Sequence, residues 1–172
     1  MTTLNPDQNL VLIGMPGSGK STVGVLLAKR LGMGFVDTDL LIQEQAGRTL
    51  QDIVDQDGYQ ALRQIEEQVL LALDVQHQII STGGSAVYSA AAMAHLKANS
   101  RVVFLDISLT EVKKRIGDFS SRGISRRPHQ SLEDVFDERL VLYKRHADLR
   151  IKGDAVNQET VCQRVVDAVT LR

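Results

Sequence analysis

The sequence contains few residues that cross-link or stiffen a chain. It contains one cysteine, Cys162, and three prolines among 172 residues. A single cysteine excludes an intramolecular disulfide and a zinc cluster built on cysteines, so a reducing environment suits the chain best. A chain of this length can bury a core without such cross-links, and we expect one domain rather than two.

Long hydrophobic runs and charge of one sign are also missing. Lys plus Arg (20) nearly balances Asp plus Glu (21), which argues against a surface that is basic all over and binds nucleic acid or anionic lipid. Apolar runs such as residues 10–13 and 69–73 are far shorter than the span of about 18 residues that a membrane helix needs. The first eight residues lack the basic and then apolar order of a signal peptide. We therefore expect a cytoplasmic, monomeric protein with no membrane and no nucleic-acid partner.

Short apolar runs alternate with longer stretches of helical period along the whole chain. Strands are expected at residues 10–13, 34–36, 78–81, 101–106 and 149–152. Helices are expected to begin near Lys20, Leu40, Tyr59, Ser89, Leu109, Leu132 and Glu159, and Ser108 with Glu111 has the spacing of a capping box. This alternation predicts a three-layer α/β/α fold over residues 1–172, in which helices cover both faces of a five-stranded parallel sheet.

The pattern breaks down between residues 116 and 132 into glycine, serine, arginine and one proline. This stretch is too polar for a core and too long for a minimal connection, so we expect a mobile lid over residues 116–131. Residues 113–127 contain six basic side chains and one acidic side chain, Asp118. A nucleic-acid patch is the competing interpretation, but Phe119 is its only aromatic residue, and the rest of the chain is net acidic.

The most specific motif lies at residues 14–21, where Gly-Met-Pro-Gly-Ser-Gly-Lys-Ser is a complete GxxxxGK[ST] between an expected strand and an expected helix. Glycines let backbone N–H groups converge on phosphate oxygens, and the start of the helix adds the positive end of its dipole. Lys20 can then reach the β and γ phosphates, and the Ser21 hydroxyl can bind Mg²⁺. A plain glycine-rich turn would not explain why strand, motif and helix coincide. The residues expected to bind the nucleotide are Gly14, Gly17, Ser18, Gly19, Lys20, Ser21 and Thr22.

A phosphate-binding loop alone does not separate a kinase from a GTPase, a motor or a regulatory ATPase. No NKxD-type element for guanine recognition follows on a later strand, and RecA-like or AAA-type ATPases need a larger core. A compact domain with a long basic lid therefore favours a kinase that acts on a small molecule or a nucleotide.

From end to end the chain resembles the shikimate kinase family. The matching elements, in the family's order, are the phosphate-binding loop with Gly24 after it, Asp37-Thr38-Asp39, Leu62-Arg63-Gln64-Ile65-Glu66, Ser81-Thr82-Gly83-Gly84-Ser85, Arg127-Pro128, and Arg139-Leu140-Val141-Leu142-Tyr143 with Ala147. Each motif is weak alone, but together they run in register over roughly residues 9–170. The resemblance implies a P-loop fold like that of nucleoside monophosphate kinases. It also implies transfer of the γ-phosphoryl group of ATP to the 3-hydroxyl of shikimate, a step of aromatic amino-acid synthesis.

The resemblance also implies roles for two aspartates. Asp39 would bind the acceptor hydroxyl and help to deprotonate it, and Asp37 would hold Mg²⁺ through water. Both follow a short expected strand, at the edge where open α/β sheets bind ligands, and side chains two positions apart on a strand point the same way. Asp39 could in addition be the N-cap of the helix expected near Leu40.

Two arginines are implied to hold the carboxylate of shikimate, namely Arg63 and Arg139, since a guanidinium group is planar and permanently charged. The spacing alone leaves other interpretations open. Arg63 could form an exposed ladder of ion pairs with Glu66 and Glu67, and Arg139 could lie on a helix surface.

Gly83 and Gly84 follow an expected strand and offer bare backbone to a ring-shaped acceptor, although a simple bend would also explain them. By resemblance, Arg127 is the catalytic arginine of the lid, beside Lys20 and Asp39, and Arg115 stacks on adenine.

The chain departs from the family's usual residues around the acceptor. Ser85 replaces a third glycine, Leu62 replaces a phenylalanine, and His129 and Gln130 replace two leucines. These departures leave open a kinase of the same fold for another hydroxy acid, such as gluconate. A second alternative is a regulatory ATP-binding module without phosphoryl transfer.

Overall fold

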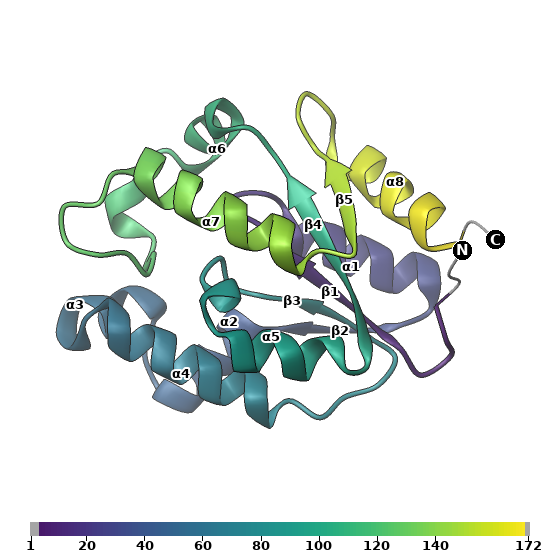
Figure 1. The fold of residues 1–172 in the computed structure, drawn as a ribbon, viewed down its shortest axis with the longest axis horizontal. Helices are drawn as coiled ribbons and strands as arrows, with labels where there is room; N and C mark the ends of the chain where they lie inside the picture. Colours follow the sequence, from purple (N-terminus) through teal and green to yellow (C-terminus); the bar gives the residue numbers. More distant parts are fainter. Residues whose placement is uncertain (1–3, 171–172) are drawn as a thin grey trace.

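The computed structural model describes residues 4–170, and within them five strands form one parallel sheet (Figure 1). The strands are β1 (Asn9–Ile13), β2 (Gly34–Asp37), β3 (Gln78–Ser81), β4 (Ser100–Asp106) and β5 (Leu149–Lys152). Their order is β2-β3-β1-β4-β5, and every pairing is parallel. All five predicted strands are confirmed. Strand β1 is central, with β2 and β3 on one side of it and β4 and β5 on the other. Such a switch in strand order opens a crevice at the carboxyl ends of the strands.

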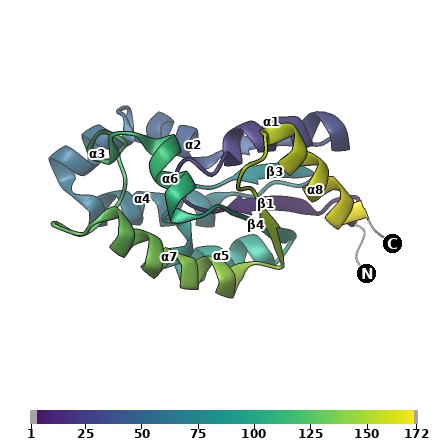
Figure 2. The ribbon, with the colours of Figure 1, turned by 90° about the horizontal axis from the view of Figure 1, so that it is seen from above.

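Helices cover both faces of the sheet, as predicted. They are α1 (Lys20–Leu31), α2 (Thr38–Ala46), α3 (Leu50–Asp57), α4 (Tyr59–Ala72), α5 (Ala90–Lys97), α6 (Leu109–Ile116), α7 (Leu132–His146) and α8 (Gln158–Thr170), with short 3₁₀ helices η1 (Ala86–Tyr88) and η2 (Phe119–Ser121). Seen from above, α1 and α8 lie on one side of the sheet and α5 and α7 on the other (Figure 2). None of the helices in residues 4–170 has both the length and the apolarity needed to cross a membrane.

Strand β1 is buried on both faces, which explains its unbroken apolar sequence. Leu10 and Leu12 belong to the apolar cluster that includes α1 and α8, while Val11 and Ile13 belong to the cluster that includes α5 and α7. A third cluster around Ile42 joins α2, α3 and α4 to one another beside the sheet. This third group of helices forms a wall next to the crevice.

Three details of the predicted helices are wrong. Helix α3 was not expected, although Thr49 and Asp52 form a capping box at its start. Helix α2 begins at Thr38, and its N-cap is Asp37 rather than Asp39, because the Asp37 side chain accepts the Asp39 N–H at 3.0 Å. The capping box before α6 is half formed.

At that helix, the Ser108 hydroxyl accepts the Glu111 N–H, as expected. The Glu111 carboxylate accepts instead from Arg115 Nε at 2.7 Å, one turn further on. The ion pair within the helix has therefore taken the side chain that would have completed the box.

The segment expected to be a lid, residues 116–131, is less exposed than its polarity suggested. Gly123, Ile124, Ser125 and Gln130 are buried. Gly123 has φ +57° and lies so close to α3 that a Cβ atom would stand 2.7 Å from the backbone nitrogen of Gln51. Part of the lid is therefore docked on α3, the helix that sequence patterning did not reveal.

Candidate active site

A pocket of about 330 Å³ opens where the phosphate-binding loop, β3, α2, α4, α7 and the lid meet. Its lining includes these predicted site residues: Gly17, Gly19, Lys20, Ser21, Thr22, Asp39, Gly83, Gly84 and Arg139. The lid contributes residues 122–125. Residues that are more than a hundred positions apart in the sequence thus face one cavity.

The phosphate-binding loop is shaped by glycines at its bends. Gly14 has φ +151°, and a Cβ there would lie 2.8 Å from the Leu105 carbonyl oxygen, so only glycine fits. Gly19 is the left-handed N-cap of α1, and no side chain caps that helix. The first N–H groups of α1 are therefore free to bind an anion.

Lys20 lies on the loop and is buried. Its Nζ donates to the carbonyl oxygens of Gly14 at 2.8 Å and Met15 at 2.9 Å. Burial lowers the pKa of Lys20 to about 8, against the opposing pull of the Asp39 carboxylate. The position of this ammonium group is thus fixed by the same loop that would hold the phosphates.

Ser21 and Asp37 come together from α1 and from the end of β2. Ser21 Oγ donates to Asp37 Oδ2 at 2.6 Å, while the other carboxylate oxygen accepts the Asp39 N–H. A second hydroxyl, that of Ser81, lies 3.3 Å from Ser21 Oγ. Hydroxyl and carboxylate oxygens in a site with few protein ligands suit Mg²⁺, which keeps several waters. These residues therefore fit the predicted cation.

Asp39 faces the pocket from the first turn of α2, so the prediction that Asp37 and Asp39 point the same way along a strand is wrong. A Cβ on Gly83 would stand 2.7 Å from Asp39 Oδ1 and 2.5 Å from Glu66 Oε1. The two carboxylates therefore converge on bare backbone at Gly83. Burial raises the pKa of Asp39, and the nearby Lys20 charge opposes that effect.

Glu66 is a buried residue of this pocket that the sequence did not place among the expected site residues. Burial raises its pKa to about 7, although a hydrogen bond from the Ser85 hydroxyl opposes that shift. Its Oε1 atom is buried and has no hydrogen-bond partner. Ser85, the residue in place of a third glycine, therefore lines the pocket itself and also donates to the Glu66 carboxylate.

Arg139 is 1% exposed, so its interpretation as a helix-surface residue is wrong. Its Nη2 donates to the Ser125 carbonyl oxygen at 2.6 Å. A Cβ on Gly84 would stand 2.7 Å from Arg139 Nη1, which places that nitrogen against the glycine backbone.

Arg63 meets the same lid residue, because its Nε donates to Ser125 Oγ at 2.8 Å. Its guanidinium carbon lies 3.7 Å from the centre of the Tyr88 ring, and its Nη2 is buried without a partner. The exposed ladder with Glu66 and Glu67 is therefore wrong. Arg63 borders an adjoining cavity of about 290 Å³, which shares Glu66 and Ser85 with the main pocket.

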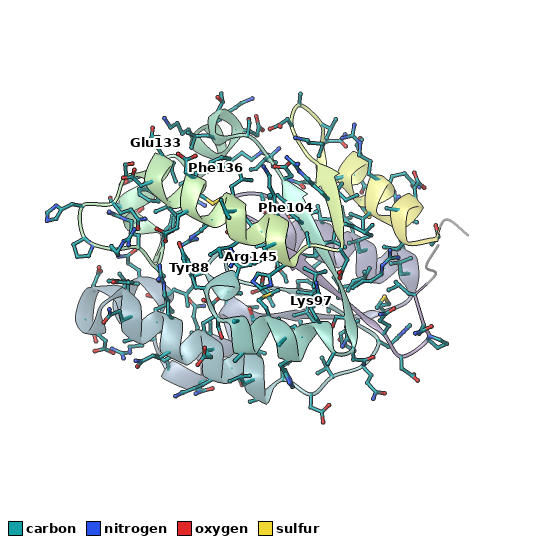
Figure 3. The ribbon with its side chains drawn as sticks, viewed as in Figure 1. Tyr88, Lys97, Phe104, Glu133, Phe136 and Arg145 are labelled. Carbon is teal, nitrogen blue, oxygen red and sulfur yellow. The ribbon has the colours of Figure 1, made fainter. Side chains whose placement is uncertain are left out.

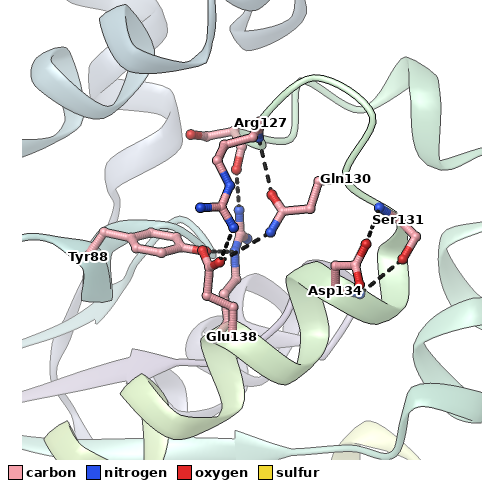
Figure 4. Close-up of polar contacts among 8 residues, drawn as sticks. Tyr88, Arg127, Gln130, Ser131, Asp134 and Glu138 are labelled. Atoms are coloured by element: carbon pink, nitrogen blue, oxygen red, sulfur yellow. Dashed lines mark hydrogen bonds and ion pairs between the residues drawn. The ribbon is translucent and has the colours of Figure 1, made fainter.

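Arg127 is not directed into the pocket. Its side chain is 61% exposed, and Nη2 donates to Glu138 Oε2 at 2.7 Å (Figure 4). Gln130 strengthens this arrangement: it accepts the Arg127 N–H and donates to the same carboxylate. The expectation that Arg127 lies at the transferred phosphate is not met in this conformation, and Arg122 lines the pocket in its place.

Two side chains lie on the nucleotide side of the loop. Arg115 Nη2 donates to the Gly153 carbonyl oxygen at 3.2 Å, and Arg115 Nη1 lies 3.5 Å from the Gly17 carbonyl oxygen. Gln158, which sequence analysis missed, lies against Gly19 and has a buried Oε1 without a partner. No motif signalled Gln158, since its place depends on how α8 packs beside α1.

A five-stranded parallel sheet, a phosphate-binding loop after β1 and an acceptor pocket walled by α2 to α4 define a P-loop kinase that acts on a small molecule. The family model for shikimate kinase matches residues 16–170. On this match and the relatives below, the chain belongs to the shikimate kinase family and is an ATP-dependent kinase, which confirms the fold and family that the sequence predicted.

The relatives match the chain over nearly its full length. Shikimate kinase from Mycobacterium avium (strain 104) is 40% identical over 159 residues, which are 91% of this chain and 90% of that protein. Shikimate kinase from Sulfurihydrogenibium sp. (strain YO3AOP1) is 34% identical over 166 residues, covering 96% and 99%. The structure of shikimate kinase from Acinetobacter baumannii in complex with shikimate matches with a TM-score of 0.85 at 27% identity, covering 96% of each chain.

Proposed function

We propose that this chain transfers the γ-phosphoryl group of ATP to the 3-hydroxyl of shikimate, giving shikimate 3-phosphate and ADP. The observation that carries the proposal is the meeting of Arg63 and Arg139 on Ser125, beside the pocket that holds Lys20 and Asp39. Two guanidinium groups next to a carboxylate base suit an acceptor with one carboxylate and several hydroxyls. Relatives of the same name cover nearly the whole chain, which supports the same substrate.

On the nucleotide side, the N–H groups of the loop and of α1 would bind the phosphates, and Lys20 would compensate their charge. Ser21 and Asp37 would hold Mg²⁺, which supplies further positive charge to the phosphate oxygens when bound. Arg115 would stack on adenine beside Gly153.

On the acceptor side, Asp39 would bind the reacting hydroxyl and accept its proton. A carboxylate with a raised pKa is a stronger base, and Lys20 keeps Asp39 from being protonated too readily. The bare backbone at Gly83 and Gly84 would let the ring approach this carboxylate. Arg63 and Arg139 would hold the acceptor's carboxylate and so orient its hydroxyl.

The lid, residues 116–131, would close over the two substrates and exclude water. Arg127 would then leave Glu138 and stabilise charge on the transferred group. Every side chain used comes from one chain, so the proposed enzyme can act as a monomer.

A coupled assay of ADP release, run with shikimate, gluconate and related hydroxy acids, tests the proposal. We expect turnover with shikimate and a far lower kcat/KM with the other acids. Faster turnover of another acid would replace shikimate as the substrate. Tight ATP binding without acceptor-dependent ADP release would overturn phosphoryl transfer itself.

A further inference from the structure

Tyr88 lies at the centre of the acceptor side, between α4 and α7 (Figure 3). It ends η1, a few residues after the glycines that line the pocket. The Arg63 guanidinium carbon lies 3.7 Å from the centre of its ring, and that of Arg139 lies 5.5 Å away. Both arginines proposed to hold the acceptor's carboxylate therefore touch one aromatic side chain.

The phenol group of Tyr88 connects Arg139 with the lid arginine, Arg127, through Glu138. Its oxygen accepts from Arg139 Nε at 3.4 Å. Its O–H donates to Glu138 Oε1 at 2.6 Å (Figure 4). The other oxygen of Glu138 accepts from Arg127. Tyr88 is thus in direct contact with the arginine pair and is one residue removed from the lid arginine.

A ring suits this position because of its charge distribution. Burial lowers the pKa of Arg63, and the nearby charge on Arg139 lowers it further. A carboxylate between them would hold them in place but would neutralise them, whereas the face of an aromatic ring attracts cations without removing their charge. The unpartnered Nη2 of Arg63 shows that donor capacity remains available.

We propose that Tyr88 is a positioning residue that holds Arg63 and Arg139 as a pair for the carboxylate of the acceptor. This inference rests on the proposed function. The ring keeps the guanidinium groups together, and the hydroxyl sets the angle of Arg139 by connecting it with Glu138.

The test compares Tyr88→Phe and Tyr88→Leu in steady-state kinetics with shikimate and with its methyl ester, which lacks the negative charge. We expect the KM for shikimate to rise roughly 3- to 10-fold when the hydroxyl alone is lost and roughly 10- to 100-fold when the ring is lost as well. The KM for ATP should stay within about twofold, because Tyr88 touches no nucleotide residue. The KM for the methyl ester should rise much less than the KM for shikimate.

Tyr59→Phe is the matched control. The centre of the Tyr59 ring lies 5.0 Å from the Arg63 guanidinium carbon, and the Tyr59 hydroxyl accepts from the exposed Gln60 side chain. Removing that hydroxyl should leave the KM for shikimate unchanged.

An unchanged KM for shikimate in both Tyr88 variants would overturn the inference. An equal rise in KM for shikimate and for its methyl ester would overturn it as well. If Tyr88→Leu fails to fold, Tyr88→Phe still decides, since it keeps the ring and the shape. Wild-type protein that does not turn over shikimate would reject the proposed function and this inference with it. Wild-type turnover with unaffected Tyr88 variants would reject the inference alone.

Discussion

Lys20 shows how burial prepares one side chain for an anionic ligand. Its pKa is lowered to about 8, so the free protein begins to lose this charge just above neutral pH. Phosphate binding favours the charged form and must restore the proton at higher pH. We expect the Kd for ATP, measured by calorimetry, to be about tenfold weaker at pH 9 than at pH 7.

The Lys20→Met variant is the control for this pH dependence. It should lose phosphoryl transfer while keeping its circular dichroism spectrum, and its weak residual ATP binding should no longer change between pH 7 and pH 9. A Kd for ATP that follows pH equally in wild type and variant would contradict the assignment to Lys20.

Burial shifts the pKa of Glu66 in the opposite direction to that of Lys20. It raises the pKa of the Glu66 carboxyl group to about 7 from an ordinary 4.5. The unfolded chain releases this proton at lower pH than the folded chain does. The stability that Glu66 contributes is therefore complete below pH 4.5 and is lost as the pH rises through 7. Between pH 5 and pH 8, the free energy of unfolding of wild type should fall by about 2 to 3 kcal/mol relative to Glu66→Gln.

Urea denaturation of both proteins at the two pH values measures this difference. Parallel pH profiles would mean that Glu66 titrates normally in the folded state. Its signals in the sequence were its place in the Leu62–Glu66 motif and its position one turn after Arg63 in a helix, and neither shows that α4 turns this face towards the pocket.

The lid is the element whose closure we propose to control catalysis. Arg127 is held by Glu138 on the surface, and an exposed ion pair contributes little to stability. If lid closure brings Arg127 to the transferred phosphate, Arg127→Ala should lower kcat by roughly 10³-fold with little change in stability. Stopped-flow or steady-state ADP release measures kcat, and thermal unfolding checks the fold.

Arg126→Ala is the matched control for the lid arginine. It removes a neighbouring cation that packs on Phe119 and donates to the Gln130 carbonyl oxygen. Its kcat should change only a few-fold. An Arg127→Ala variant that alters KM alone would assign that residue to binding rather than to the transition state.

Among the elements, the strands were the easiest to predict and the lid the hardest. Strands β1 and β4 are buried on both faces, so their apolar sequence was enough to predict them. Helix α3 has a single buried residue, Ile53, and its amphipathic pattern is correspondingly short. Because the lid docks on α3 at Gly123, missing that helix also hid the burial of Gly123.

For the molecule as a whole, we propose that residues 1–172 form a single kinase domain in which both ligands stabilise one cooperative fold. Mg·ADP and shikimate, each at about 100 times its Kd, should each add about 2.7 kcal/mol to the free energy of unfolding. For a chain of this size, each ligand should then raise the Tm by roughly 5 to 11 °C. Differential scanning fluorimetry measures both shifts.

The Lys20→Met variant separates the two ligands in this experiment. It should lose most of the shift due to Mg·ADP and keep the shift due to shikimate, because Arg63 and Arg139 are intact. Two separate unfolding transitions in wild type would contradict a single domain.

Local chemistry was enough to predict much of this protein. The phosphate-binding loop needs its glycines, lysine and serine in a short contiguous stretch between a strand and a helix, so one window of sequence carries the whole signal. Contacts between distant residues depended on packing in three dimensions. Arg63 and Ser125 are 62 positions apart, Arg127 turns to Glu138 instead of the pocket, and Tyr88 reaches both arginines only because α4 and α7 flank η1. No local pattern contains these partners, because each depends on how the helices pack around the sheet.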